Sequence, residues 1–254
     1  MTNPFATAEM AVGYAAARPP VHPRIVEQYF AQRGEARVGL AVDLGCGAGL
    51  STRAVQPYAA QVLGLEPVVM MVRLANRMVS GAVFAAAAGE ALPLSDHSVD
   101  LITAAGSLNY VRDLNRCFDE MRRVLRQHGS LLVYDFGAGR RFDGQDALNR
   151  WFETFVARYP YPASEATPLD PQTLARLATG FELRRQSPFV IGLTLSRPAY
   201  EAYILTETNV AAAVRDGAVL DGIAAWVSDT LSGFWADDSR DVLFEGYWAE
   251  LVVA

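Results

Sequence analysis

The chain has 254 residues and a net charge of −6, and it is 51% hydrophobic and 20% charged. This apolar content suffices for a buried core, and the acidic balance argues against a broad nucleic-acid-binding surface, which needs clustered Lys and Arg. The two cysteines and three isolated histidines indicate neither a disulfide framework nor a metal site. With no recognisable secretory signal and no apolar run long enough to span a membrane, the sequence predicts a soluble, cytoplasmic protein.

The first 140 residues alternate strand-like and helix-like segments. Strands are expected at residues 38–44, 61–65, 82–87, 99–105 and 130–136. A stripe formed by Leu114, Phe118, Met121 and Leu125 predicts a helix over residues 114–128, which Gly129 would end in the left-handed conformation. This alternation predicts an α/β fold, with a doubly wound, mostly parallel sheet between two helical layers.

The pattern changes after residue 139. Helices are expected at residues 146–159, 170–178 and within 198–235, and strands at 181–195, which Pro188 interrupts, and at 246–253. A strand at the end of the chain suggests an antiparallel addition to the sheet. We therefore expect a single domain over residues 1–254. Its predicted parts are a lid and helix (1–35), a cofactor-binding core (36–139), helical cap insertions (140–180 and 196–240) and the final strands (181–195 and 246–254).

The most informative segment is AVDLGCGAGLS, residues 41–51, in which an apolar strand leads into three alternating glycines. Glycines let the backbone turn tightly and approach a ligand closely. The spacing is G-x-G-x-G and differs from the G-x-G-x-x-G of dinucleotide enzymes. Asp43 places a carboxylate beside this loop, which disfavours a pyrophosphate and favours a ligand that carries an ammonium group.

A second acidic residue, Glu66, ends the next predicted strand in the segment GLEP. A carboxylate at this position can accept hydrogen bonds from both ribose hydroxyls, as acidic residues do in nucleoside-binding α/β folds. The combination of strand, Asp43, glycine loop, helix, strand and Glu66 predicts a nucleoside cofactor.

The segments VDLGCGAG, LGLEP and GEALPLSDHSVDLITAAGSLNYV together resemble class I S-adenosylmethionine-dependent methyltransferases. The similarity is greatest to the small-molecule group that includes methyltransferase type 11 and trans-aconitate methyltransferase-like proteins. The resemblance implies a three-layer fold with a seven-stranded sheet in the order 3-2-1-4-5-7-6, whose last strand is antiparallel, and a helical cap. It also implies S-adenosyl-L-methionine as cofactor and S-adenosyl-L-homocysteine as its product.

The resemblance further implies which residues bind the cofactor. They are Tyr14, Arg18, Asp43, Gly45, Cys46, Gly47, Glu66, Pro67, Met71, Gly89, Glu90, Ala91, Ala105, Gly106 and Ser107. Gly45 and Gly47 would lie under the methionine portion, Glu66 would bind the ribose, and Met71 would pack on the adenine. Ala88 stands where the family often has a polar residue, which leaves the contact to the adenine amino group open.

The expected activity is transfer of a methyl group to a small-molecule carboxylate, hydroxyl or amine by in-line displacement. The sequence contains no close His/Asp pair that would serve as a general base, which favours a carboxylate acceptor or an amine with a lowered pKa. Candidate catalytic residues are His22, Asn109 and Tyr110, and candidate acceptor-binding residues are Tyr14, Asn109, Tyr110, Arg197 and Tyr203.

Two alternatives remain open. One is a cofactor-binding protein of the same fold that transfers no methyl group, and the other is an NAD-dependent oxidoreductase, which the glycine spacing disfavours. The expected partner is a small-molecule acceptor, without nucleic acid, membrane or metal, and the chain would be a monomer or homodimer. A nucleic-acid methyltransferase is disfavoured because AGSLNYV lacks the Pro-Pro-aromatic box that such enzymes use around a flipped base.

Overall fold

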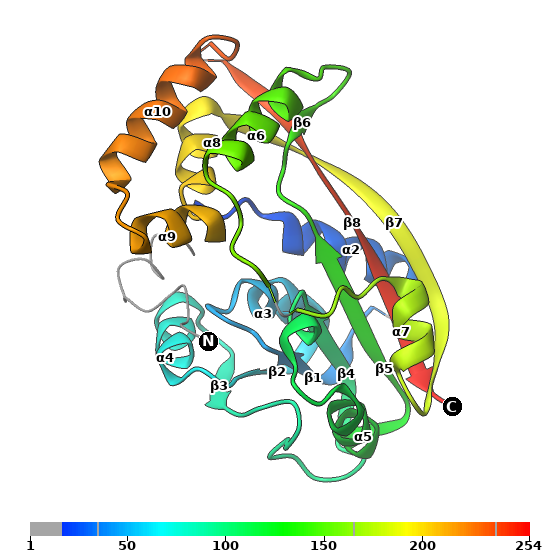
Figure 1. The fold of residues 1–254 in the computed structure, drawn as a ribbon. Coiled ribbons are helices and arrows are strands. Elements are labelled where there is room, and N and C mark those ends of the chain that lie inside the picture. The colour runs from blue at the N-terminus through cyan, green and yellow to red at the C-terminus, as the bar shows by residue number, and fades with distance from the viewer. Residues whose placement is uncertain (1–16, 35, 165, 237) are drawn as a thin grey trace. The chain divides into compact units, whose positions relative to one another are not determined.

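A computed structural model describes residues 17–254 except residues 35, 165 and 237 (Figure 1). The chain forms two compact units, each built from separate stretches of the sequence. The sheet unit comprises His22–Phe136, Glu165–Phe189 and Gly246–Ala254. The helical unit comprises residues 17–21, Gly137–Ser164 and Val190–Glu245.

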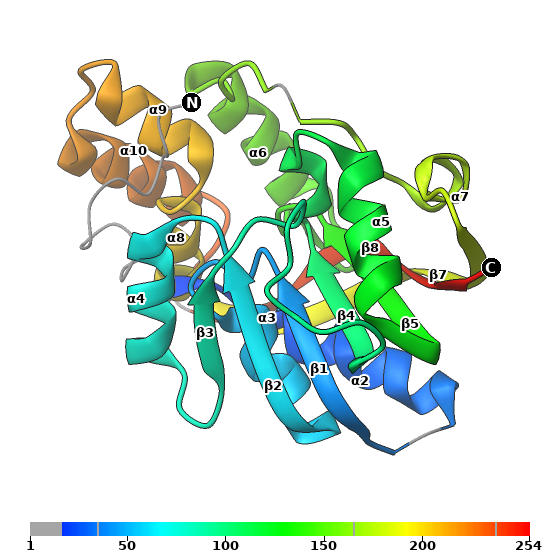
Figure 2. The ribbon, with the colours of Figure 1, turned by 90° about the horizontal axis from the view of Figure 1, so that it is seen from below.

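Five parallel strands form the centre of the sheet, and Figure 2 shows them side by side. They are β1 (Val38–Leu44), β2 (Ala59–Glu66), β3 (Val83–Ala86), β4 (Val99–Ala105) and β5 (Leu125–Phe136). Their order is β3-β2-β1-β4-β5, and each neighbouring pair is parallel. The α/β fold with a mostly parallel sheet is therefore confirmed.

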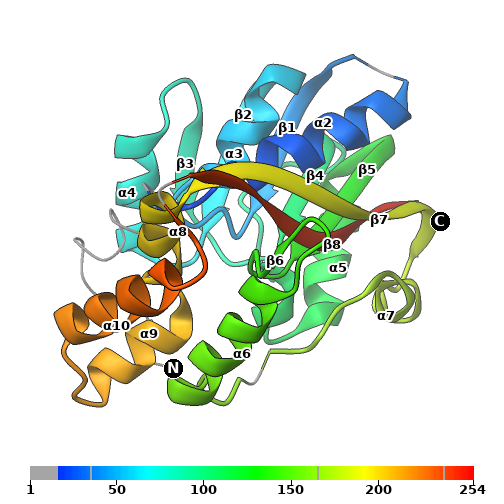
Figure 3. The same ribbon diagram turned by 90° about the horizontal axis from the view of Figure 1, so that it is seen from above.

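The last strand, β8 (Ser239–Val253), lies antiparallel to β5, with Ser130 opposite Val252 and Phe136 opposite Gly246. The strand β7 (Phe181–Ser196) contains Pro188 and pairs with β8, and Figure 3 shows these two long strands together. This arrangement confirms the predicted antiparallel insertion of the last strand. A two-residue strand, β6 (Arg141–Phe142), also pairs with β8, so the sheet has eight strands among the described residues where seven were expected.

The helices of the sheet unit cover both faces of the sheet. They are α2 (Val21–Arg33), α3 (Leu50–Val55), α4 (Val69–Met78), α5 (Leu114–Val124) and α7 (Pro171–Leu177), with short 3-10 turns at Gln56–Tyr58 and Leu108–Tyr110. Ala249 and Leu251 of β8 belong to the core cluster that includes α5 and α7. Trp248 contacts Tyr29 of α2 instead. Since successive side chains of a strand point to opposite faces, α2 and α5 lie on opposite faces of the sheet.

The boundary predicted between α5 and β5 is wrong. The helix expected over residues 114–128 ends at Val124, and β5 begins at the next residue. The left-handed residue is His128, with φ 71°, and Gly129 is not left-handed. The pairing of β4 with β5 jumps from Val99↔Leu125 to Leu101↔Ser130, so the chain bulges between them. Glycine is needed at position 129 because a Cβ would lie 3.0 Å from the backbone oxygen of Arg126.

Aromatic side chains form much of the core of the helical unit. Its helices are α6 (Ala147–Arg158), α8 (Arg197–Ile204), α9 (Thr208–Arg215) and α10 (Leu220–Ser232), so the predicted helical region 198–235 is three separate helices. Trp151 of α6 stacks on Phe155 and on Trp226 of α10, with ring centroids 5.3 and 6.1 Å apart. The Trp151 indole N–H donates to the Thr230 hydroxyl over 2.8 Å. None of the described helices has the length and apolar content needed to cross a membrane.

Candidate cofactor site

The candidate site lies in the sheet unit, where β1, β2, β4 and β5 end. Because these strands are parallel, the residues that follow them meet at one edge of the sheet, which is where open α/β sheets bind ligands. The glycine loop follows β1, Glu66 ends β2, Gly106 and Ser107 follow β4, and Asp135 lies at the end of β5.

The glycine loop is held against the end of β2. The N–H groups of Gly45 and Cys46 both donate to the Leu65 carbonyl oxygen, over 2.7 and 3.1 Å. Gly45 has φ 68°, and a Cβ there would lie only 2.4 Å from the Cβ of Ser107. Both the left-handed backbone and the close packing therefore require glycine at position 45.

Gly47 differs from Gly45 in having open space in front of it. Its φ is 53°, and among the described residues a Cβ would approach only the Met71 methyl carbon within 4 Å, at 3.8 Å. Its N–H donates to Oε2 of Glu66 over 3.1 Å. The loop thus presents bare backbone beside Glu66 and Met71, in a space that a side chain at position 47 would fill.

Asp43 holds the glycine loop in position through hydrogen bonds to neighbouring elements. Its carboxylate is fully buried and accepts hydrogen bonds from three hydroxyls, those of Ser51 (2.6 Å), Thr52 (2.6 Å) and Thr103 (2.9 Å). Burial raises the pKa of Asp43, and the hydrogen bonds offset only part of that effect. Its observed contacts join β1, the start of α3 and β4.

Glu66 is the acidic group nearest to the open space. One carboxylate oxygen accepts the N–H of Gly47, and the other accepts the N–H of Val68 over 3.0 Å. Each carboxylate oxygen can accept about two hydrogen bonds, so each retains acceptor capacity. The residue is 8% exposed, and burial raises the pKa of its carboxyl group.

Asp135 is a site residue that the sequence analysis missed. Its carboxylate accepts the side-chain N–H of Asn109 over 2.9 Å and the N–H of Phe136 over 2.8 Å. A Cβ on Gly106 would lie 3.0 Å from Asp135 Oδ1, so glycine lets this carboxylate approach the end of β4. Burial raises the pKa of Asp135. The available signal was an acidic residue ending the strand-like run LLVYDF.

This edge of the sheet is therefore acidic, and basic side chains of the described residues do not neutralise its carboxyl groups. Among the residues that the structure describes, no Lys or Arg forms an ion pair with Asp43, Glu66 or Asp135. Their hydrogen-bond donors are neutral hydroxyls, an amide and backbone N–H groups. Buried carboxylates in such surroundings favour a cationic ligand, because a nearby positive charge stabilises their ionised form.

Several other predicted residues have local contacts that explain their identity. The Ser107 hydroxyl donates to the Leu44 carbonyl over 2.6 Å, which ties the end of β4 to the end of β1. Gly89 is required by packing, since a Cβ would lie 2.7 Å from the Cys117 sulfur. Cys46 is buried, and burial raises the pKa of its thiol, so it is an unreactive packing residue. Glu90 accepts the N–H of Asp113 over 3.4 Å.

The other predicted residues of the sheet unit are either held by local contacts or exposed. His22 contacts the Tyr134 hydroxyl over 3.0 Å, with its ring edge-on to Phe136. Tyr110 is 65% exposed, and Pro67, Ala88 and Ala91 are also exposed. Tyr14 lies outside the described residues.

Three predicted residues belong to the helical unit. Arg18 pairs with Glu207 over 3.0 Å, and Arg197 pairs with Glu201 over 3.0 Å. Tyr203 is buried under the Arg18 guanidinium, which lies 5.2 Å from its ring centre. No group of His, Cys, Asp and Glu within the described ranges could hold a metal ion.

Comparison with known proteins gives a family match in the sheet unit. Residues 42–133, which run from β1 into β5 and contain the glycine loop and Glu66, match the methyltransferase domain family. In this region the chain is similar to methyltransferase domains. This similarity implies a cofactor of the S-adenosylmethionine type, and together with the relatives below it supports S-adenosylmethionine-dependent methyl transfer in general.

The curated relatives match only part of the chain. An uncharacterised methyltransferase of Bacillus subtilis, YcgJ, is 32% identical over 108 residues, covering 41% of this chain and 42% of the relative. A malonyl-[acyl-carrier protein] O-methyltransferase of Pseudescherichia vulneris is 30% identical over 109 residues, covering 43% of each chain. The matches thus span less than half the length of these relatives.

Solved structures extend the likeness in fold to most of the chain. A provisionally assigned type II methyltransferase from Anaeromyxobacter dehalogenans has a TM-score of 0.69 at 23% identity, covering 92% of this chain and 94% of its own. The [4+2]-cyclase SpnF has a TM-score of 0.54 at 23% identity, covering 91% and 81%. At these identities the likeness shows the fold alone, and a cyclase among the similar structures means that the fold by itself does not determine the reaction.

Proposed function

We propose that this protein is an S-adenosylmethionine-dependent methyltransferase that acts on a small-molecule acceptor. The observation that carries the proposal is the carboxyl group of Glu66 beside the open backbone of Gly47, with that of Asp135 at the end of β5 on the same edge of the sheet. S-adenosylmethionine bears a sulfonium and an ammonium group, and both suit an acidic edge. The pyrophosphate of NAD would meet the same carboxylates without a cation to offset them.

The residues fit the cofactor in a definite way. In this proposal the remaining acceptor capacity of Glu66 takes the ribose hydroxyls, Gly45 and Gly47 lie under the methionine portion, and Met71 packs beside the adenine. Asp43 keeps its hydroxyl partners and acts by holding the loop in position. Gly106 and Ser107 lie at the methyl end.

When bound, the cofactor supplies a methyl group that the sulfonium has already activated. The protein therefore has to align the acceptor, exclude water and, for some acceptors, remove a proton. Asp135 is suited to the last task because it is partly buried, has a raised pKa and is held by Asn109. A hydroxyl or amine acceptor would deliver its proton to Asp135, whereas a carboxylate would need no base.

Product formation tests the proposal directly. The protein is incubated with S-adenosylmethionine and, separately, with small carboxylates, phenols and amines, and S-adenosylhomocysteine is measured by mass spectrometry. We expect one acceptor class to raise S-adenosylhomocysteine production above the rate without acceptor. A protein that binds S-adenosylhomocysteine but turns over no acceptor would instead support the second candidate.

The second candidate is a protein of this fold that binds the cofactor without transferring a methyl group. The observation in its favour is the similarity in fold to the [4+2]-cyclase SpnF. Turnover separates the two candidates, since both predict cofactor binding.

A further inference from the structure

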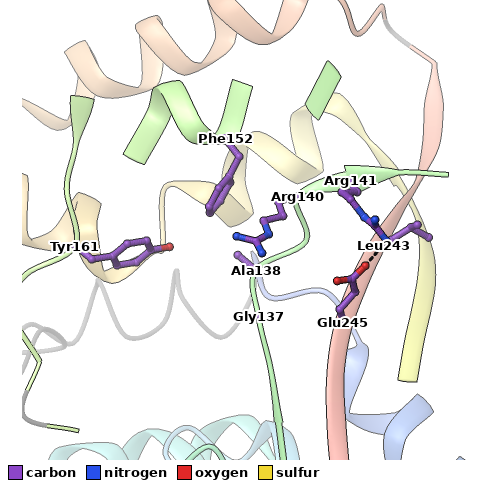
Figure 4. A pocket seen from close by; sticks show the side chains of 8 residues that line it. All are labelled: Gly137, Ala138, Arg140, Arg141, Phe152, Tyr161, Leu243 and Glu245. Atoms are coloured by element: carbon purple, nitrogen blue, oxygen red, sulfur yellow. Dashed lines mark hydrogen bonds and ion pairs between the residues drawn. The ribbon is translucent and has the colours of Figure 1, made fainter. Parts of the chain in front are cut away.

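The helical unit contains a pocket of about 230 Å³ that no part of the proposed cofactor site uses. Figure 4 shows Arg140, Phe152 and Tyr161 pointing into a common space on one side, and Arg141 with Glu245 on the other. The pocket lies wholly within the helical unit.

The charges around this pocket leave one positive charge uncompensated. Arg141 forms an ion pair with Glu245, so these two lining residues neutralise each other. The nearby acidic side chain of Glu207 is paired with Arg18 over 3.0 Å. In the part of the chain that the structure describes, Arg140 has no acidic partner within ion-pair distance. A single guanidinium is therefore available to a ligand.

The two aromatic residues supply an apolar wall next to this guanidinium. Phe152 is 6% exposed and Tyr161 is 41% exposed. The Tyr161 hydroxyl donates to Glu207 over 2.9 Å, so its hydrogen is already used. Burial and the Glu207 charge raise the pKa of Tyr161, and the positive charges of Arg18 and Arg140 partly oppose this effect. Tyr161 can therefore offer a ligand its ring, with its hydrogen-bond donor committed elsewhere.

We propose that this pocket binds a small molecule with a flat apolar body and one carboxylate, which pairs with Arg140. A guanidinium forms two parallel hydrogen bonds to a carboxylate, and one uncompensated positive charge matches a monoanion better than a phosphate dianion. A cavity of about 150 Å³ holds benzene in another protein, so the volume here suffices for a substituted ring.

Binding of this ligand goes beyond the proposed function, and it involves only residues of the helical unit.

Ligand-observed NMR titration of the full chain tests the pocket without any methyl transfer. The probes are benzoate, the neutral benzamide and inorganic phosphate, and the variants are Arg140→Gln and Arg150→Gln. Arg150 is a matched control because it is an exposed arginine of α6 that does not line the pocket. We expect benzoate to bind more tightly than benzamide or phosphate. Arg140→Gln should weaken benzoate binding about tenfold or more, and Arg150→Gln should leave it unchanged.

Equal benzoate binding by the wild-type protein and Arg140→Gln would overturn the proposal, as would tighter binding of phosphate or no benzoate binding at all. A parallel titration with S-adenosylhomocysteine separates this failure from that of the proposed function. Benzoate binding without S-adenosylhomocysteine binding would preserve the pocket and contradict the methyltransferase function, and the reverse result would do the opposite.

Discussion

Glu66 and Asp135 are carboxyl groups whose hydrogen-bond donors are all neutral. Burial raises the pKa of both above its ordinary value. Because their folded-state pKa is raised, the folded protein without ligand binds more protons than the unfolded chain between the ordinary and the raised pKa. Their contribution to stability is therefore greatest below the ordinary pKa and is lost as the pH rises through the raised one.

The raised pKa values of Glu66 and Asp135 predict that protons are released when a cationic ligand binds. A sulfonium near these groups favours their ionised form, so the affinity for S-adenosylmethionine should increase as the pH rises from the ordinary carboxyl pKa through the raised one. Calorimetry in two buffers with different ionisation enthalpies measures the protons released. S-adenosylhomocysteine, which lacks the sulfonium charge, should release fewer. Equal release by the two ligands would show that the acidic edge does not sense the sulfonium.

The open space at Gly47 predicts how a side-chain methyl group added at this position affects ligand binding. Gly47→Ala should weaken S-adenosylhomocysteine binding by at least about tenfold, since the added methyl would occupy ligand space. Gly144→Ala is the matched control, because Gly144 has φ 65° and nothing within 4 Å of a Cβ. Both changes should cost about 1 kcal/mol of stability for the left-handed backbone. Unchanged binding in Gly47→Ala would exclude a ligand at this position.

Asp135 can be tested through its pH dependence. For a hydroxyl or amine acceptor, Asp135→Asn should lower kcat by about 10²- to 10⁴-fold, the usual contribution of a general base, and should abolish the acidic limb of the pH profile. S-adenosylhomocysteine affinity, measured by calorimetry, should change by less than about threefold, because Asp135 is not assigned to the cofactor. A variant that keeps both kcat and its pH profile would remove Asp135 from the mechanism.

The site residues differ in how far sequence could predict them. Gly45, Gly47 and Glu66 lie in short motifs, and the structure brings them together through the hydrogen bond from Gly47 to Glu66. Asp135 was missed because its partners, Gly106 and Asn109, are remote in sequence and meet it only through the pairing of β4 with β5. Arg140 belongs to no motif, and only the packed helical unit reveals that it has no acidic partner among the described residues.

At the scale of elements, strand and helix alternation predicted the parallel sheet because each strand has its own apolar run. The end of α5 was mispredicted for a physical reason. Leu125 continues the apolar stripe of the helix, yet it is buried as the first residue of β5. Helical periodicity alone cannot distinguish an apolar residue buried on a helix from one buried at the start of a strand. β6 was missed because two residues carry no periodicity.

The bulge at the start of β5 predicts that substitutions at positions 128 and 129 have opposite effects on stability. His128→Gly should stabilise the protein by about 0.5–1 kcal/mol. Glycine adopts the left-handed backbone without strain, and this gain exceeds the cost of the conformational entropy that glycine adds to the unfolded chain. Gly129→Ala should destabilise it by about 1–3 kcal/mol, since the Cβ would press on Arg126 and Val99 backbone oxygens. Chemical denaturation measures both changes. A destabilised His128→Gly variant would mean that the imidazole makes a contact worth more than the strain.

For the whole molecule, the chain divides into a sheet unit with the candidate cofactor site and a helical unit with the Arg140 pocket. No Gly/Ser or Pro-rich linker marks this division, because the chain passes between the units along continuous strands such as β7 and β8. The sequence motifs all lie in the sheet unit. The helical unit is held by aromatic packing, a pattern that many sequences satisfy, which explains why its ligand could not be predicted from motifs.

The most direct test of the account is calorimetric titration of the protein with S-adenosylmethionine, S-adenosylhomocysteine and NAD in parallel. The account predicts that both adenosyl ligands bind, one per chain with micromolar affinity, and that NAD does not. Binding of NAD alone would mean that the acidic edge does not select against a pyrophosphate. Absence of binding by all three ligands would contradict the cofactor site itself.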